Sequence, residues 1–262
     1  MNFIKEKIYV TCEDNIDLMK RFNENETDVA FIDPEYGIGE SSKNHKSRNT
    51  PIVQKNGKKL KAKDSVYLKK EWDNKPPDDL FFKEIKRVSK NQVIFGANYF
   101  PQIINEPCKP PRRNEYNQFL KKNPRGFIIW DKVNGSNDFN DCEIIYTSYD
   151  FDSFIVYYMW NGMMQGVEVS TDLQKAIIQI GDKTKNEKRL HPTQKPLKLI
   201  RWLFNFLNLF GLKIIDTNAG LMGTVIVSIE ADCEIYACDN DAQYYELGIN
   251  RIKNHLSQKS LF

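Results

Sequence analysis

Residues 33–36, Asp-Pro-Glu-Tyr, combine groups that could do chemistry together. They follow the apolar run at 29–32 and precede a turn that contains Gly37 and Gly39. A carboxylate, a rigid peptide carbonyl and an aromatic ring are thereby expected at the carboxyl end of a buried strand, where α/β folds form their ligand crevices. Methylation of an exocyclic amine requires these three groups. The same residues are also typical of an ordinary turn, so this segment alone does not decide the function.

A second segment of interest is 214–220, Ile-Ile-Asp-Thr-Asn-Ala-Gly, which predicts a strand that enters a tight turn before a helix near residue 222. A glycine here lets a ligand approach the backbone closely, and helix N–H groups can meet an anion. The next predicted strand, 234–238, ends at Asp239, whose carboxylate could accept hydrogen bonds from both hydroxyls of a ribose. An ordinary βαβ unit has the same pattern, and no Gly-x-Gly-x-x-Gly fingerprint favours a dinucleotide.

The third segment is 190–197, Leu-His-Pro-Thr-Gln-Lys-Pro-Leu, which precedes a strongly amphipathic stretch. Pro196 fits the first turn of the predicted helix, and Thr193 is expected to cap it. Capping accounts for the threonine and the prolines. It leaves His191, Gln194 and Lys195 unexplained as a set.

The hydrophobic pattern predicts the elements that must position these segments. Strands are expected at 7–11, 29–32, 92–95, 127–130, 142–146, 154–159, 213–216 and 234–238. Helices are expected at 15–22, 80–88, 196–210, 222–230 and 241–255. Strands that alternate with helices predict an α/β fold with a doubly wound, mostly parallel sheet.

Composition narrows the class of protein. A chain of 262 residues with 40% hydrophobic and 28% charged residues suits one α/β domain with an inserted or appended module. The five cysteines form no Cys-x-x-Cys pair, and with only three histidines they offer no zinc-ligand spacing, so we expect no metal. Scattered thiols, the absence of a signal peptide and the absence of a membrane-length apolar run predict a cytoplasmic, nucleoid-associated protein.

Positive charge is concentrated in one segment. Residues 43–70 hold ten Lys/Arg and a single acid, Asp64, whereas the whole chain has a net charge of only +3. We interpret residues 40–75 as a long basic loop that meets a polyanionic partner. A solvated lysine-rich loop without a partner has the same composition.

Together these segments resemble the amino-group DNA methyltransferases that use S-adenosylmethionine. The His-Pro-Thr-Gln-Lys-Pro block of that family matches residues 191–196 without change. The catalytic Asp/Asn/Ser-Pro-Pro-Tyr/Phe tetrapeptide resembles 33–36, and the cofactor loop Asp-Pro-Phe-x-Gly-Ser-Gly resembles 216–222. The catalytic segment comes first and the cofactor segment last, which resembles the circularly permuted β order. The likeness covers most of the chain outside roughly 40–75 and 135–190.

The resemblance implies a Rossmann-like methyltransferase sheet with an inserted loop and a small target-recognition region. It implies a catalytic part at 1–134, a recognition region at 135–190 and a cofactor-binding part at 191–262. The implied catalytic residues are Asp33, Pro34 and Tyr36. The implied cofactor-binding residues are Asp216, Asn218, Gly220, Asp239, Thr193 and Lys195. The implied DNA-binding residues are Lys43, Lys46, Arg48, Lys58, Lys59, Arg112, Arg113 and Arg189.

The function expected from the resemblance is transfer of a methyl group from S-adenosylmethionine to adenine N6 of a base flipped out of double-stranded DNA, as in restriction-modification systems. Cytosine N4 is the alternative target. Glu35 replaces the second proline of the tetrapeptide, and Asn218 replaces an aromatic residue of the cofactor loop, so a DNA-binding protein without catalysis is a further alternative. RNA or a glutamine amide is a third substrate class. The expected assembly is a monomer or homodimer, and the sequence specifies neither a recognition site nor a cognate nuclease.

Overall fold

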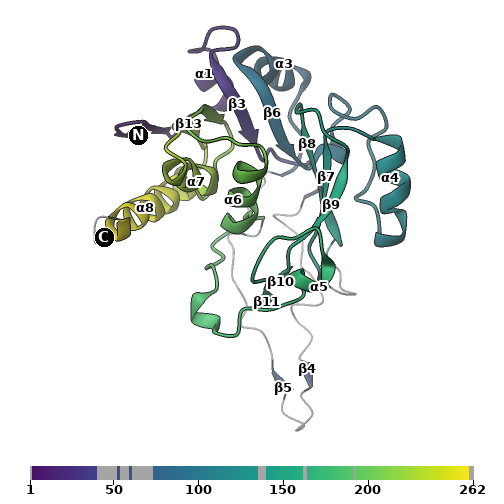
Figure 1. The fold of residues 1–262 in the computed structure, drawn as a ribbon. Coiled ribbons are helices and arrows are strands. Elements are labelled where there is room, and N and C mark those ends of the chain that lie inside the picture. The colour runs from purple at the N-terminus through teal and green to yellow at the C-terminus, as the bar shows by residue number, and fades with distance from the viewer. Residues whose placement is uncertain are drawn as a thin grey trace.

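The computed structural model describes residues 2–39, 52–53, 59–60, 73–134, 140–161, 164–191 and 193–259. Within these residues the centre of the molecule is a nine-stranded sheet with the strand order β1-β2-β13-β12-β3-β6-β8-β7-β9 (Figure 1). The strands are β1 (Asn2–Lys5), β2 (Ile8–Thr11), β3 (Thr27–Ile32), β6 (Ser89–Phe95), β7 (Phe127–Asp131), β8 (Cys142–Thr147), β9 (Phe154–Tyr157), β12 (Lys213–Asp216) and β13 (Glu234–Cys238).

The middle of the sheet is parallel. β2, β13, β12, β3 and β6 pair in parallel in that order, and β7 pairs in parallel with β9. β8 is antiparallel to both of its neighbours, β6 and β7, and β1 is antiparallel to β2. The predicted mostly parallel sheet is therefore confirmed, with β8 as an antiparallel strand inside it.

Helices cover both faces of the sheet because the strands are apolar on both sides. Val29 and Phe31 of β3 face a core formed with α6 (Leu197–Phe206), α7 (Gly223–Glu230) and α8 (Ala242–Lys259). Ala30 and Ile32 of the same strand face a core formed with α1 (Asn15–Met19) and α3 (Asp79–Val88). At the far end of the sheet, α4 (Tyr116–Lys122) packs on β7 and β8. This alternation is the doubly wound arrangement.

The two halves of the chain meet between β3 and β12. From β3 the chain crosses through α3 to β6, whereas from β12 it crosses through α7 to β13 on the opposite side. The connections therefore diverge at the β3–β12 boundary, and open α/β sheets bind ligands in the crevice outside the carboxyl ends of strands at such a point. Asp33, Asp216 and Asp239 all lie at the carboxyl ends of β3, β12 and β13.

Most of the predicted elements are confirmed, but the sequence did not predict α4 or the short elements at 160–165 and 173–176. Three further differences concern β1, α6 and the basic loop. β1 was not predicted, because Asn2–Lys5 is a largely exposed edge strand without an apolar run. The helix expected at 196–210 ends at Phe206, and Asn208 then adopts a left-handed conformation with φ 53°. The strands β4 (Ile52–Val53) and β5 (Lys59–Leu60) fall in the segment that was interpreted as loop.

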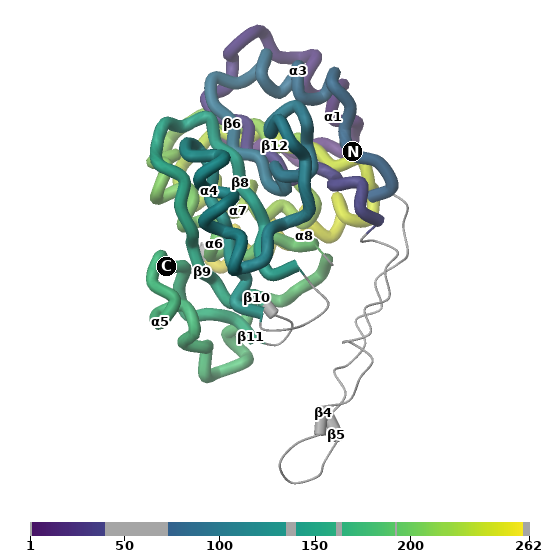
Figure 2. Tube along the Cα trace, turned by 90° about the vertical axis from the view of Figure 1, so that its right-hand side faces the viewer, coloured from purple at the N-terminus to yellow at the C-terminus, as the bar shows by residue number. Residues whose placement is uncertain are grey.

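The region 135–190, which we interpreted as a recognition region, contributes to two parts of the molecule. β8 and β9 belong to the central sheet. Its other described residues include the small hairpin of β10 (Trp160–Asn161) and β11 (Met164–Gln165) and the short helix α5 (Leu173–Ala176), which lie together below β9 in both views (Figures 1 and 2). In the described part of the chain, no helix combines the length and apolarity needed to cross a membrane.

Candidate active site

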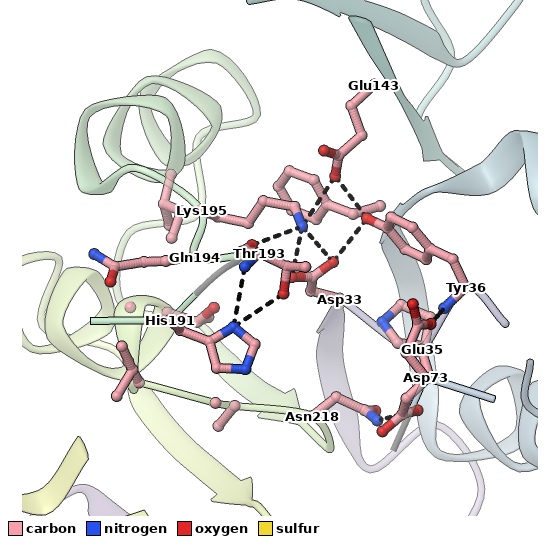
Figure 3. Close-up of a pocket in the computed structure, with 18 of the residues that line it drawn as sticks. Asp33, Glu35, Tyr36, Asp73, Glu143, His191, Thr193, Gln194, Lys195 and Asn218 are labelled. Carbon is pink, nitrogen blue, oxygen red and sulfur yellow. Dashed lines mark hydrogen bonds and ion pairs between the residues drawn. The ribbon is translucent and has the colours of Figure 1, made fainter. Parts of the chain in front are cut away.

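One large cavity lies at the carboxyl ends of the central strands and has a volume of about 640 Å³. Asp33, Pro34 and Tyr36 line it from the end of β3. The predicted cofactor-binding residues line the same cavity, namely Asp216, Asn218, Gly220, Asp239, Thr193 and Lys195. The structure therefore brings together three segments that are far apart in the sequence (Figure 3).

The backbone after Asp33 is held by a residue from across the basic segment. Asp73, which is 2% exposed, accepts hydrogen bonds on Oδ1 from the backbone N–H groups of Tyr36 (3.0 Å) and Gly37 (2.9 Å). Its own carbonyl accepts a further bond from the N–H of Gly39 at 2.9 Å. Gly37 has φ 69° and its Cα lies against Pro76, so a side chain at this position would be strained. These contacts fix the direction in which residues 33–39 leave β3.

The Tyr36 ring is also held from several sides. Its hydroxyl oxygen lies 2.9 Å from Asp33 Oδ1 and 2.6 Å from Glu143 Oε1, so the hydroxyl can donate its proton to either carboxylate. The ring stacks on Tyr99 with centroids 5.1 Å apart. Gly96, at the end of β6, has φ 67°, and a Cβ atom there would overlap the Tyr36 ring. The glycine that ends β6 is thus required twice, for its backbone conformation and for the space that the ring occupies.

Lys195 forms a buried ion-pair network with two carboxylates. Its Nζ lies 2.7 Å from both carboxylate oxygens of Asp33 and 3.0 Å from Oε1 of Glu143. The other oxygen of Glu143 pairs with Lys132 at 3.0 Å. The side chains of Lys195 and Glu143 are only 7% and 9% exposed, so these charges interact with little screening. The sequence predicted a role for Lys195 at the cofactor, whereas the structure places its ammonium on the carboxylate of Asp33.

Burial and the neighbouring opposite charges shift the pKa of each group in this network in opposite directions. Burial, together with the negative charge of Glu143, raises the pKa of Asp33 even though Lys195 opposes the shift. Burial alone would raise the pKa of Glu143, but the charges of Lys195 and Lys132 lower it to about 2. Burial alone would lower the pKa of Lys195, but Asp33 and Glu143 together raise it. Glu143 is thus held ionised and Lys195 is held protonated.

Acidic side chains surround the loop at 216–222 after β12, which resembles the family's cofactor loop. Asp239 accepts a hydrogen bond from the N–H of Gly220 at 2.8 Å and another from the N–H of Asp241 at 2.9 Å. A Cβ atom at Gly220 would meet no described atom within 4 Å, so the backbone there borders open space. Asp216 is 2% exposed, accepts a hydrogen bond from the N–H of Asn218 at 3.1 Å, and has its pKa raised to about 7 by burial.

Two of the residues that depart from the motifs of the resembled family, Glu35 and Asn218, contact each other. The amide of Asn218 donates to Oε2 of Glu35 at 3.1 Å, and this bond joins the segments after β12 and β3 (Figure 3). Burial, with the nearby negative charge of Asp239, raises the pKa of Glu35 to about 7. The two substitutions thus form one polar contact on the wall of the cavity.

The expectation that Thr193 caps α6 is wrong. The helix begins at Leu197 after Pro196 as the N-cap residue, and no side chain of the cap accepts a hydrogen bond. The Thr193 hydroxyl lies 3.0 Å from Nδ1 of His191 instead. The N–H of Leu197 donates to Oε2 of Glu187 at 2.8 Å, which gives the helix a carboxylate at its positive end.

Glu187 connects most of the elements around the cofactor-like loop. Its Oε1 accepts hydrogen bonds from the amide of Gln194 (2.8 Å) and from the guanidinium of Arg251 in α8 (2.7 Å). Arg251 in turn donates to the carbonyl of Leu221 at 2.9 Å. Gln194 is therefore explained by its contact with Glu187, and His191 by its edge-to-face contact with Tyr244, with centroids 4.3 Å apart.

The predicted DNA-binding residues have different placements. Arg113 makes a bidentate ion pair with the buried Asp131 (2.6 and 2.7 Å), which indicates a structural contact. The guanidinium of Arg112 lies 3.6 Å from Asp141 and its side chain is exposed, whereas Arg189 lines the cavity beside Trp160. Lys43, Lys46, Arg48 and Lys58 lie outside the described residues, and Lys59 is described only as part of β5. Among the described residues, no group of three or more His, Cys, Asp or Glu side chains is arranged to hold a metal ion.

Four site residues were not found from the sequence: Asp73, Lys132, Glu143 and Glu187. Glu143 lies inside β8 and Asp73 follows a long basic segment, so neither has a spacing that marks it as functional. Lys132 carried the only signal, because it lies two residues after the predicted strand at 127–130, at the same edge of the sheet as Asp33.

No protein-family model matches the sequence, and no curated protein matches it. Among solved structures, the chain is similar to M1.HpyAVI in complex with SAM, at 12% identity and a TM-score of 0.45 over 93% of this chain and 98% of that one. It is similar to TTHA0409, a proposed DNA modification methylase from Thermus thermophilus complexed with S-adenosyl-L-methionine, at 15% identity and 0.45 over 94% and 93%. It is also similar to the PvuII DNA methyltransferase (cytosine-N4-specific), at 12% and 0.46 over 95% and 91%. These likenesses are too distant to transfer a function or a site residue.

Proposed function

We propose that this protein transfers a methyl group from S-adenosylmethionine to an exocyclic amine of a base flipped out of double-stranded DNA. The observation that carries the proposal is that Asp33 and Tyr36 share one cavity with Gly220 and Asp239. An amine acceptor and a nucleotide-like donor can therefore meet at the β3–β12 boundary. The exact match of residues 191–196 to the family's motif supports the same assignment.

The residues present fit S-adenosylmethionine. A cavity of about 640 Å³ is within the range of roughly 300–1,000 Å³ that small-molecule sites occupy. Two backbone N–H groups orient the Asp239 carboxylate, which would hold the ribose hydroxyls. The open backbone at Gly220 allows close approach, and the acidic groups Glu35 and Asp216 complement a positively charged ligand.

When bound, S-adenosylmethionine supplies a methyl group on a positively charged sulfur, and transfer to an amine forms one C–N bond, breaks one C–S bond and releases one proton. Asp33 and the carbonyl of Pro34 would accept hydrogen bonds from the amine and hold its lone pair toward the donor. Tyr36 would stack on the base. Alignment of this kind supplies much of the acceleration of a two-substrate reaction. Asp33, whose pKa burial raises, would take the released proton directly or through water.

Adenine N6 is the proposed target and cytosine N4 the alternative, since the same acceptors suit both amines. Either amine is paired inside a duplex, so the nucleotide must leave the stack before it reaches the cavity. DNA methylated in vitro is digested and its nucleosides are identified by mass spectrometry. We expect N6-methyl-2′-deoxyadenosine, and N4-methyl-2′-deoxycytidine alone would reject the adenine assignment.

A DNA-binding protein without catalysis is the second candidate, and the Glu35–Asn218 contact favours it because both residues depart from the family pattern. The two candidates differ in cofactor binding. Calorimetry with S-adenosylhomocysteine should give clear 1:1 binding that Asp239→Ala weakens. Absence of binding by the wild-type protein, together with retained DNA binding, would support the second candidate.

A further inference from the structure

The ammonium of Lys195 occupies the acceptor atoms that the proposed reaction needs. Its Nζ lies 2.7 Å from Oδ1 and 2.7 Å from Oδ2 of Asp33. An amine that approaches Asp33 must therefore compete with a buried, charged hydrogen-bond donor. A charge-assisted bond of this type is about twice as strong as a neutral one. The inference that follows rests on the proposed function.

A second carboxylate lies within reach of the same ammonium. Oε1 of Glu143 is 3.0 Å from Nζ of Lys195 and also accepts the Tyr36 hydroxyl at 2.6 Å. Oε2 of Glu143 pairs with Lys132 at 3.0 Å, which leaves Oε1 directed at Lys195 and Tyr36 (Figure 3). Glu143 thus contacts both the ammonium and the ring that flank Asp33.

The charges of this group are balanced. Asp33 and Glu143 carry two negative charges when ionised, and Lys195 and Lys132 carry two positive charges. Because Lys195 already bonds to both carboxylates, it can lose its bonds to Asp33 and keep a buried ionic partner. Without Glu143, an ammonium displaced from Asp33 would be left buried and unpaired, which is strongly unfavourable.

We propose that Glu143 is a positioning residue that holds Lys195 when the substrate amine takes its place on Asp33. Lys195 then moves from a position shared between two carboxylates to one on Glu143, while the Tyr36 hydroxyl stays bonded to the same oxygen. Asp33 gains a free lone pair for the amine without a change in the net charge of the group.

The activity test uses Glu143→Gln, Lys195→Met and the double variant, assayed for methyl transfer to DNA at pH 8.5 because burial raises the pKa of Asp33. Glu143→Gln leaves Asp33 as the remaining carboxylate partner of Lys195, so we expect kcat to fall about 10²-fold with little change in KM for DNA. Removing the lysine as well should recover about tenfold of that loss, because the competing ammonium is gone. A double variant no more active than Glu143→Gln would overturn the proposal. Glu234→Gln is the matched control. It replaces a carboxylate that accepts a hydrogen bond from the Tyr236 hydroxyl at 2.6 Å, at the amino end of β13 and away from the cavity, and it should leave kcat unchanged.

A second measurement does not depend on methyl transfer. Nitrogen-15 NMR reports whether the Lys195 ammonium is hydrogen-bonded, through its slow proton exchange, and the Lys195→Met spectrum assigns the signal. In Asp33→Asn the signal should persist, because Glu143 holds the ammonium, and it should vanish in Asp33→Asn/Glu143→Gln. Loss of the signal in Asp33→Asn alone would overturn the role of Glu143. If the variants give the expected NMR signals but the wild-type protein transfers no methyl group to DNA, the proposed function is rejected and the contact between Glu143 and Lys195 is not.

Discussion

At the residue scale, the surroundings of Asp33 set its chemical properties. It ends a buried strand, and it faces a tyrosine hydroxyl and an ammonium within 2.9 Å. Burial raises its pKa, which makes it a better proton acceptor than a solvated aspartate. Its function therefore depends on its surroundings as much as on its own side chain.

Asp33→Asn should abolish most turnover, because the amide keeps the shape of the side chain but cannot accept a proton. General-base contributions are typically about 10²–10⁴-fold, so we expect kcat for methyl transfer to fall within that range. Circular dichroism and thermal melting should show a folded protein. Asp17→Asn, which removes an exposed carboxylate paired with Lys20, is the control and should retain activity. Full activity of Asp33→Asn would remove Asp33 from the proposed site.

We expect Glu35 to make the affinity for S-adenosylmethionine depend on pH. Its pKa is raised to about 7, so the carboxyl is neutral at pH 6 and negative at pH 8. The affinity for positively charged S-adenosylmethionine relative to S-adenosylhomocysteine, which lacks the sulfonium charge, should therefore rise about three- to tenfold over this interval. Calorimetry at each pH measures the ratio.

Glu35→Gln should flatten this rise, because the amide carries no charge at either pH. Asp216, whose pKa is also raised to about 7, is unchanged in that variant and should retain part of the effect. An equally steep rise in the wild-type and variant proteins would show that Glu35 does not face the sulfonium.

At the scale of elements, β3 was predicted from its continuous apolar run at 29–32, whereas β12 and β13 were predicted from shorter apolar runs between charged residues. β3, β12 and β13 are buried on both faces, and the turn residues that follow them mark their ends. Their adjacency could be inferred only through the resemblance, since no local pattern states which strands pair. The early end of α6 at Phe206 was missed because apolar residues continue beyond it to Phe210.

Contacts that cross between elements were beyond the reach of sequence patterns. Glu143 lies between the apolar residues Cys142 and Ile144 of β8. Its partners Lys195 and Tyr36 are 52 and 107 residues away in the sequence. Glu187 lies in a polar stretch without periodicity. Both residues are identified only in the folded structure, where their carboxylates contact hydrogen-bond donors from other elements.

Glu187→Ala should destabilise the junction of α6, α8 and the loop at 191–196. The substitution leaves the guanidinium of Arg251 and the N–H of Leu197 without their carboxylate partner. Removal of one partner from a largely buried pair costs about 2–4 kcal/mol, which we expect as the loss in the free energy of unfolding by urea. Glu246→Ala, an exposed change within α8, is the control and should stay within about 0.5 kcal/mol of wild type.

At the scale of the whole molecule, the cavity lies at one edge of the sheet, and the basic segment 40–72 begins and ends next to it. The bond from the N–H of Gly39 to the carbonyl of Asp73 closes the two ends of that segment beside Tyr36. Lys43, Lys46 and Arg48 lie outside the described residues but follow Gly39 closely in the sequence, so we expect them to meet the phosphates of a DNA whose base enters the cavity. Lys20, Lys86 and Lys90 lie instead near the amino ends of β3 and β6, at the opposite edge.

We therefore expect the salt dependence of DNA binding to come mainly from the cations of the basic segment rather than from cations at the opposite edge of the sheet. Each phosphate contact contributes a slope of roughly 0.9 to the fall of log K with log salt concentration. Replacement of Lys43, Lys46 and Arg48 by glutamine should lower the slope by about 2–3 in fluorescence-anisotropy titrations with duplex DNA. The matched replacement of Lys20, Lys86 and Lys90 removes the same charge and should change the slope by less than about 1. Equal changes in both variants would mean that net charge, rather than the edge that carries the cavity, attracts the DNA.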